Sequence, residues 1–133
     1  MRQLTSSLFI FLVPFIISCN KTKEETSLSI TGSWELRKSY GGFIAVDTVY
    51  YLPGNGNILT FSTTTYQSFS QGRLIETASY KIIKDTTAGQ ISNRLVLNNR
   101  PDFEKIFIEM DSERLKWIDN MPDHGIIEYQ RIH

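Results

Sequence analysis

Short runs in which apolar and polar residues alternate recur along most of this chain. In the run from Ile30 to Leu36, the apolar residues Ile30, Trp34 and Leu36 occupy even positions, and the odd positions carry Thr, Ser and Glu. Alternation with a period of two is typical of a strand that buries one face. No helical period of useful length follows Ser29, so the pattern predicts an all-β domain.

Turn signals such as Gly41-Gly42 and Gln71-Gly72 separate eight such runs. The predicted strands are residues 30–40, 58–62, 64–70, 73–84, 94–98, 103–110, 114–118 and 125–133. Residues 85–93 (DTTAGQISN) are predicted to form a polar loop. In the third strand the alternation leaves open whether Tyr66 or Phe69 leads the buried face. The other inward residues are predicted to be Leu59, Phe61, Ala78, Tyr80, Ile82, Leu95, Leu97, Ile106, Ile108, Met110, Leu115, Trp117 and Tyr129.

An open sheet of eight short strands would leave two unpaired edges, and pairing the last strand with the first removes both. The sequence therefore predicts a small eight-stranded, up-and-down antiparallel β-barrel. Eight strands enclose an interior that side chains can fill or that can hold one small ligand. Several large aromatic residues point inward, and each buries about 150–250 Å². The pattern leaves both a filled and a hollow barrel open.

The N-terminus has the layout of a secretory signal. Arg2 precedes a ten-residue apolar run at residues 8–17, and the small residue Ser18 stands before Cys19. The run is too short to span a bilayer, which takes about 20 apolar residues. The predicted organisation is a signal peptide at residues 1–18, a polar flexible tether at 19–28 and one folded domain at 29–133.

Cys19 is the only cysteine, so the exported domain has no disulfide to stabilise it. The stretch Ile16-Ile17-Ser18-Cys19 resembles the lipobox of Gram-negative bacterial lipoproteins. That resemblance implies cleavage before Cys19, acylation of its thiol and amine, and attachment to the outer membrane on its periplasmic face or at the cell surface. A free thiol after an uncleaved signal is the alternative.

Charge and composition narrow the possible functions. Lys and Arg number 14, as do Asp and Glu, so no basic field favours nucleic acid. The residues Asp119, Asp123 and His124 could hold a divalent metal, but Pro122 and Gly125 favour a turn at this position instead. No nucleophile with a base and no carboxylate pair stands out. We therefore expect a protein that is not an enzyme and that uses neither a metal nor a cofactor.

Four segments resemble the lipocalin-like domains of small bacterial lipoproteins. They are Gly32-Ser-Trp34, Leu59-Thr-Phe61, Ala78-Ser-Tyr80-Lys-Ile82 and Tyr129-Gln-Arg131-Ile132. In lipocalins the Trp of the first motif packs under an Arg from the last strand, at the closed end of the barrel. The resemblance implies that Gly32, Trp34 and Arg131 have a structural role in closing this barrel.

The connection from Gly41 to Asn57 is long and unusually apolar for a solvated loop, and loops of more than about 12–15 residues are often functional. In lipocalins the corresponding connection folds over the open mouth. The leading hypothesis is that a small apolar or amphipathic ligand binds there. The alternatives are that the connection plugs the barrel, or that a filled barrel is the scaffold for loops that bind a partner. The candidate ligand-binding residues are Phe43, Ile44, Val46, Tyr50, Tyr51 and Leu52.

Overall fold

The computed structural model describes residues 29–42, 47–87, 89–120 and 125–133. Nine strands are present in these ranges, and no helix is. Their bounds are β1 Gly32–Tyr40, β2 Val49–Tyr50, β3 Ile58–Phe61, β4 Thr65–Ser70, β5 Arg73–Thr87, β6 Gln90–Leu97, β7 Ile106–Met110, β8 Arg114–Asp119 and β9 Ile126–Ile132. No helix among the described residues is long and apolar enough to cross a membrane.

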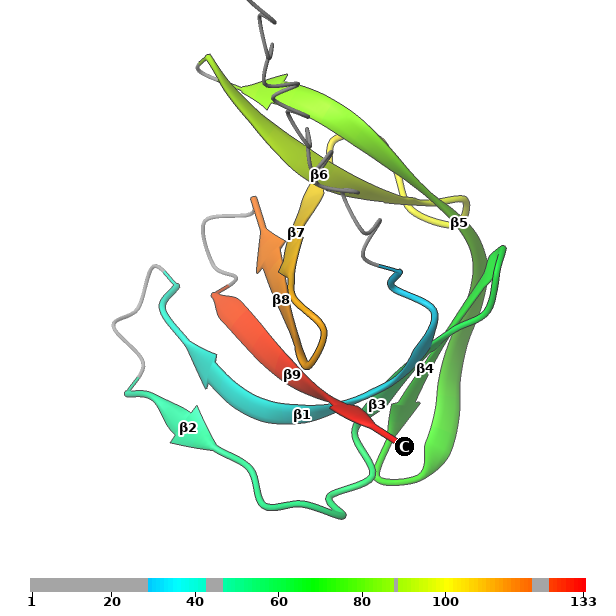
Figure 1. The fold of residues 1–133 in the computed structure, drawn as a ribbon, viewed down its shortest axis with the longest axis vertical. Coiled ribbons are helices and arrows are strands. Elements are labelled where there is room, and N and C mark those ends of the chain that lie inside the picture. The colour runs from blue at the N-terminus through cyan, green and yellow to red at the C-terminus, as the bar shows by residue number, and fades with distance from the viewer. Residues whose placement is uncertain (1–28, 43–46, 88, 121–124) are drawn as a thin grey trace, which may run out of the picture.

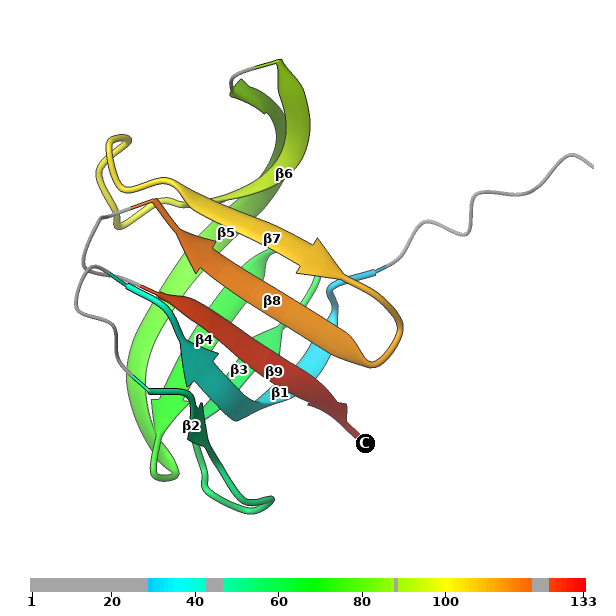
Figure 2. The same cartoon turned by 90° about the vertical axis from the view of Figure 1, so that its left-hand side faces the viewer.

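Eight of the strands form a closed antiparallel barrel, and β2 is an extra strand on its outside (Figure 1). Each strand from β3 to β8 pairs with the next one in sequence, and β1 pairs with both β3 and β9. Figure 2 shows β7, β8, β9 and β1 side by side along one wall. The predicted up-and-down barrel, closed by its first and last strands, is therefore confirmed.

Closure depends on the register between β1 and β9. The two strands pair from Ser33 opposite Ile132 to Tyr40 opposite Ile126, with a bulge at residues 36–38. On its other side, β1 pairs with β3 only through its first half, where Glu35 lies opposite Ile58. Beyond that point β2 takes the free edge of β1 and lies opposite Lys38 and Ser39. The sequence pattern did not predict this short strand.

The prediction of a polar loop at residues 85–93 is wrong. β5 continues to Thr87 and β6 begins at Gln90, and the two pair continuously from Tyr80 opposite Leu97 to Thr87 opposite Gln90. Polar residues can form a strand here because the hairpin extends beyond its neighbours into solvent, as both ribbon views show. Ile82 consequently remains 38% exposed, although it pairs with the buried Leu95.

The barrel interior is packed with large side chains. The ring centroid of Phe61 lies 5.3 Å from that of Tyr66 and 5.2 Å from that of Tyr80. The ring centroids of Tyr66 and Trp117 are 5.9 Å apart. Tyr66, and not Phe69, leads the buried face of β4. The buried apolar residues are Ile30, Trp34, Leu59, Phe61, Tyr66, Ala78, Leu95, Leu97, Ile106, Ile108, Leu115 and Trp117.

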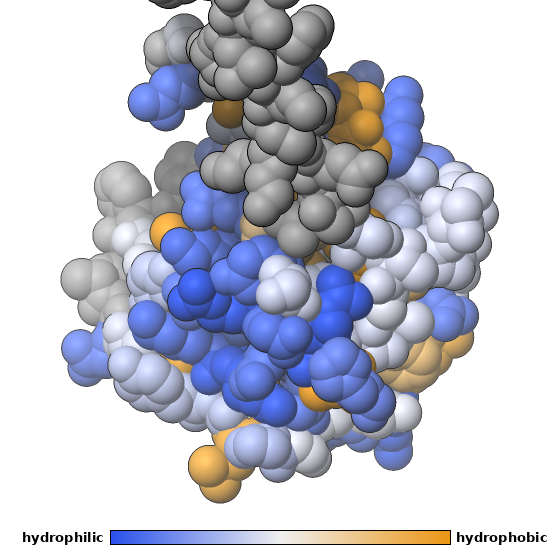
Figure 3. Space-filling model, viewed as in Figure 1, coloured by the Kyte–Doolittle hydropathy of each residue, from blue (hydrophilic) through white to orange (hydrophobic). Residues whose placement is uncertain are grey.

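The strand directions define two ends of the barrel. We call the end with residues 41–42, 47–57, 71–72, 98–105, 120 and 125 the mouth, and the end with residues 29–31, 62–64 and 111–113 the closed end. The surface turned to the viewer in Figure 3 is mostly hydrophilic, with separate apolar groups at its margins. This polar outer face and the aromatic interior together account for the alternation in the sequence.

Candidate functional site

The closed end is held by Arg131. Its guanidinium carbon lies 4.0 Å from the centroid of the buried Trp34 ring, and the two residues are register partners. The guanidinium also donates hydrogen bonds to three main-chain carbonyls, of Ser112 at 2.7 Å, Thr31 at 2.8 Å and Ser29 at 2.9 Å. The contact implied by the lipocalin resemblance is therefore present, and Arg131 joins β9 to the segment just before β1 and to the β7–β8 turn.

Gly32 is required by the same arrangement. Its φ is +130°, a backbone angle that residues with a side chain rarely adopt. A Cβ at this position would lie 2.6 Å from Nη1 of Arg131. Nε1 of Trp34 completes the arrangement by donating a 2.8 Å hydrogen bond to the carbonyl of Ile30. Gly32, Trp34 and Arg131 thus lie together where β1 pairs with β9.

The described part of the long connection, residues 47–57, lies along β1. The amide of Tyr51 donates to the carbonyl of Arg37, and the amide of Leu36 donates to the carbonyl of Asn57, both at 2.9 Å. The buried carboxylate of Glu35 accepts hydrogen bonds from the amides of Gly54 at 3.2 Å and Gly56 at 3.4 Å. The outer edge of β1 therefore fixes the course of this segment.

Glu35 is the one buried charged side chain in the described chain, and Nη1 of Arg37 lies 2.6 Å from its Oε2. Burial alone would raise the pKa of Glu35. The hydrogen bonds from Arg37 and from the amides of Gly54 and Gly56 outweigh burial and hold the pKa below its ordinary value. The ionised carboxylate is thus part of the folded structure.

Two tyrosines, Tyr51 and Tyr66, lie near Tyr129. Burial raises the pKa of Tyr66 to about 12. Burial also raises the pKa of Tyr129, and the proximity of Tyr66 and Tyr51 raises it further. We call Tyr51, Tyr66 and Tyr129 the tyrosine cluster. Each of its hydroxyls can both donate and accept a hydrogen bond.

An ion pair adjoins the tyrosine cluster. Nη2 of Arg100 lies 3.3 Å from Oε2 of Glu76, and Nδ2 of Asn99 donates to the other carboxylate oxygen at 2.8 Å. The nearby carboxylate of Glu76 also contributes to the raised pKa of Tyr66. Glu76 precedes the buried Ala78 by two positions, so it faces inward. The 98–105 connection brings Arg100 to this carboxylate.

The predicted ligand-binding residues do not all meet at this cluster. Tyr51 is half-buried and takes part in it, whereas Tyr50 is 75% exposed and Leu52 is 82% exposed. Phe43, Ile44 and Val46 lie outside the described residues, as do Cys19, Asp123 and His124. Sequence reasoning missed Glu76 and Arg100. The inward period of β5 could have identified Glu76, but no local signal identifies Arg100.

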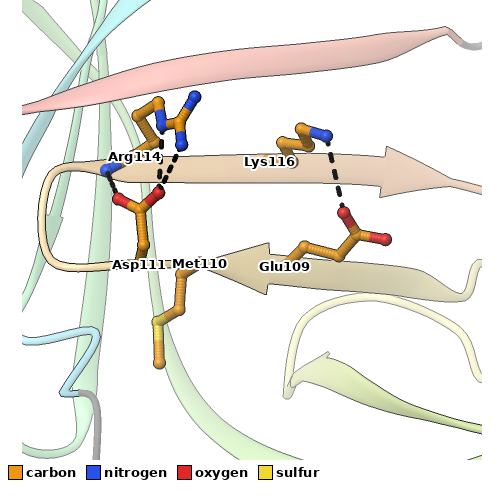
Figure 4. Close-up of a pocket in the computed structure, with 5 residues that line it drawn as sticks. All are labelled: Glu109, Met110, Asp111, Arg114 and Lys116. Atoms are coloured by element: carbon orange, nitrogen blue, oxygen red, sulfur yellow. Dashed lines mark hydrogen bonds and ion pairs between the residues drawn. The ribbon is translucent and has the colours of Figure 1, made fainter.

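A shallow groove of about 200 Å³ lies over the β7–β8 hairpin (Figure 4). Asp111 accepts bonds from the amides of Glu113 and Arg114, at 2.9 and 2.7 Å, and these bonds lower its pKa. Its carboxylate also pairs with the Arg114 guanidinium at 2.9 Å. Lys116 pairs with Glu109 at 3.6 Å. These contacts stabilise a turn, and within the described residues no group of three potential metal ligands occurs.

Comparisons of the chain with protein-family models, with curated proteins and with solved structures found no match. The architecture itself is consistent with a lipocalin-like fold. It is a small β-barrel that could bind a ligand.

Proposed function

We propose that this protein is a non-enzymatic lipocalin-like lipoprotein that binds a small amphipathic molecule at the mouth of its barrel. The observation that carries the proposal is the tyrosine cluster, in which Tyr66 and Tyr129 belong to the apolar interior and Tyr51 lies near enough to raise the pKa of Tyr129. Trp117 and Ile127, which are register partners on β8 and β9, belong to that apolar interior near the mouth. Polar groups placed over an apolar floor are typical of small-ligand sites.

The packing of the interior limits the ligand. Because Phe61, Tyr66 and Trp117 occupy the middle of the barrel, a ligand at the mouth has to be shallow. Its apolar body would rest on the floor, and a hydroxyl or amide group would meet the phenols. The cation of Arg100 is already paired with Glu76, which favours an uncharged polar group over an anion.

Titration with fatty alcohols and isoprenoid alcohols, followed by tryptophan fluorescence, tests this function. Trp117 lies beside Tyr66 and should report occupancy of the mouth. Tyr51→Ala should weaken binding at least tenfold, the loss of roughly one aromatic contact and one hydrogen bond. Its matched control is Tyr50→Ala, because the neighbouring Tyr50 is exposed, and this variant should bind as the wild type does. Binding no tighter than millimolar across the series would reject the proposal.

The proposed anchor is tested separately. Acylation at Cys19 would attach the protein to the outer membrane, because several acyl chains together give stable anchoring where one is marginal. Cys19→Ala should move the protein from the membrane fraction to the soluble fraction. An unchanged membrane fraction would show that the anchor lies elsewhere.

A second candidate function is supported by the exposed side chains of the 47–57 segment. Tyr50 and Leu52 project into solvent from a barrel whose interior is packed, as expected of a scaffold that presents a partner-binding surface. Aromatic residues often dominate such interfaces. Under this hypothesis Tyr50→Ala and Leu52→Ala would abolish capture of a protein or glycan partner, and Tyr51→Ala would not.

A further inference from the structure

The barrel wall is least complete between β6 and β7. Only three residue pairs join these strands, from Asn93 opposite Ile108 to Leu95 opposite Ile106. By contrast, eight pairs join β5 to β6 and five join β7 to β8. Beyond Asn93 and Ile108 both strands continue without pairing to each other among the described residues, and Figure 2 shows them diverging.

A groove of about 330 Å³ lies between the diverging strands. This volume is at the lower end of the range for small-molecule sites. The groove is lined by residues of three strands, namely Ile91, Ser92, Asn93, Phe107, Ile108, Glu109, Met110 and Ile118. We call it the wall slot.

Strand alternation places these residues on both sides of the wall. Ile108 is buried in the core and Met110 packs against it, so these two face the interior. Ile91 lies two positions from Asn93 and four from the buried Leu95, and residues at even spacing on a strand share a face. Ile91 is therefore on the inner side. Glu109 and Phe107 alternate with the inward residues and face outward. The wall slot is therefore lined by residues from both faces of the wall and lies beside the apolar core.

The chemistry changes across the wall slot. At the inner side, Ile91 is 72% exposed even though it is aliphatic and stands on a strand. At the outer side, Glu109 pairs with Lys116 at 3.6 Å, and both side chains are well exposed. In Figure 4 these two charged side chains lie on the opposite side of the hairpin from Met110. An exposed ion pair of this kind contributes little and exchanges partners readily.

We propose that the wall slot binds the tail of a single-chain aliphatic amphiphile, with its head group outside beside Glu109 and Lys116. The narrow gap between two strands admits an unbranched chain, and the inner residues give it an apolar contact. The paired charges at the rim suit a small polar or charged head. This site lies toward the closed end, so it goes beyond the mouth site and does not depend on it.

Photolabelling of the full-length protein in its own membranes tests the proposal, with dodecanoic acid carrying a diazirine near its terminal carbon as the probe. Adducts mapped by mass spectrometry should fall on residues 91–93 and 107–110. Unlabelled fatty acids should compete, and each added methylene should increase their potency about fourfold.

Two variants make the result specific. Ile91→Glu should reduce labelling about fifteenfold, since it removes roughly two methylene groups' worth of apolar contact. Ser92→Trp places a large side chain in the outer part of the wall slot, so it should also reduce labelling. The matched control is Ile75→Glu, which changes an isoleucine that is 64% exposed on β5 and should leave labelling unchanged.

The remaining outcomes separate the two sites. Adducts confined to Tyr51 and Tyr129 would overturn the wall slot and support the mouth. Adducts in the slot that persist in Ile91→Glu would overturn the proposal, as would the absence of adducts above the level seen with a short-chain probe. If the mouth fails its fluorescence test while slot adducts form, the proposed function falls and the wall slot stands.

Discussion

Replacing Arg131 with alanine removes the side-chain contacts that join β9 to β1 and to the residues just before it. The variant loses the cation over Trp34 and the three hydrogen bonds to the carbonyls of Ser29, Thr31 and Ser112. It keeps the main-chain pairing between β1 and β9, because that ladder involves only the backbone. The expected result is a folded but markedly less stable barrel.

The magnitude follows from these contacts. A cation over an indole ring contributes about 0.5–2 kcal/mol, depending on desolvation. A hydrogen bond from a charged group contributes roughly 1.5–3 kcal/mol when buried, and less here because water can replace Arg131 at exposed carbonyls. The free energy of unfolding should therefore fall by about 3 kcal/mol. Arg131→Lys keeps the charge but not the planar fork, so it should lose roughly half as much.

Urea denaturation followed by circular dichroism measures this loss. With an m-value of about 1.5 kcal/mol/M, the midpoint of Arg131→Ala should fall by roughly 2 M while the slope stays the same. Gly32→Ala should also destabilise the wild type, by about 1–3 kcal/mol from backbone strain, and further by displacing the guanidinium.

A double-mutant cycle then tests the reasoning. In the Arg131→Ala background Gly32→Ala meets no guanidinium, so only backbone strain remains and its cost should be smaller by about 1 kcal/mol. Additive losses, or a loss below about 1 kcal/mol for Arg131→Ala alone, would refute the proposed closing role of this contact.

The remaining predictions concern ionisable groups. Because the pKa of Glu35 is lowered in the fold, its contribution to stability is present above its ordinary pKa of 4.5 and is lost as the pH falls. Glu35→Gln should cost about 2 kcal/mol near neutral pH, measured by urea denaturation, and should flatten the acid decline. A wild-type profile that is flat through this range would contradict it. The pKa of Tyr66 is raised to about 12, so stability should be complete below the ordinary tyrosine value of 10.0 and should decrease as the pH rises from 10.0 towards 12. Tyrosinate absorbance should show Tyr66 and Tyr129 ionising last or only on unfolding, and early ionisation of all six tyrosines in the folded state would oppose this.

The barrel could be predicted from the sequence because its core obeys a short-range rule. Leu59 and Phe61 flank the polar Thr60, and Leu115 and Trp117 flank Lys116; each pair is buried in the structure. The closure also followed from local pattern, since the only economical partner for an unpaired first strand was the last one. The filled interior could not be predicted, because it depends on how rings from different strands meet, as Tyr66 and Trp117 do.

Solvent-exposed strands and long-range polar contacts escaped prediction for different reasons. Residues such as Thr86 and Ser92 in the β5–β6 hairpin carry no apolar period, yet they pair across the hairpin because the backbone alone supplies the ladder. Glu35 stands at a polar position of the alternation in β1, yet it is buried, and its burial depends on Gly54 and Gly56, about twenty residues away. At the candidate site, Tyr51 was predicted from an apolar loop, whereas Arg100 reaches Glu76 only through the folded 98–105 connection.

Native-state amide hydrogen exchange tests the central claim, a barrel closed by β1 and β9 with an open seam between β6 and β7, most directly. The account predicts that amides along the β1–β9 ladder, from Ser33 to Tyr40 and from Ile126 to Ile132, include the most protected ones in the protein and exchange only on global unfolding. It predicts rapid local exchange where β6 and β7 lack a shared ladder, at Gln90–Ser92 and Glu109–Met110. Rapid exchange across the β1–β9 ladder, or full protection along both facing edges of β6 and β7, would contradict it.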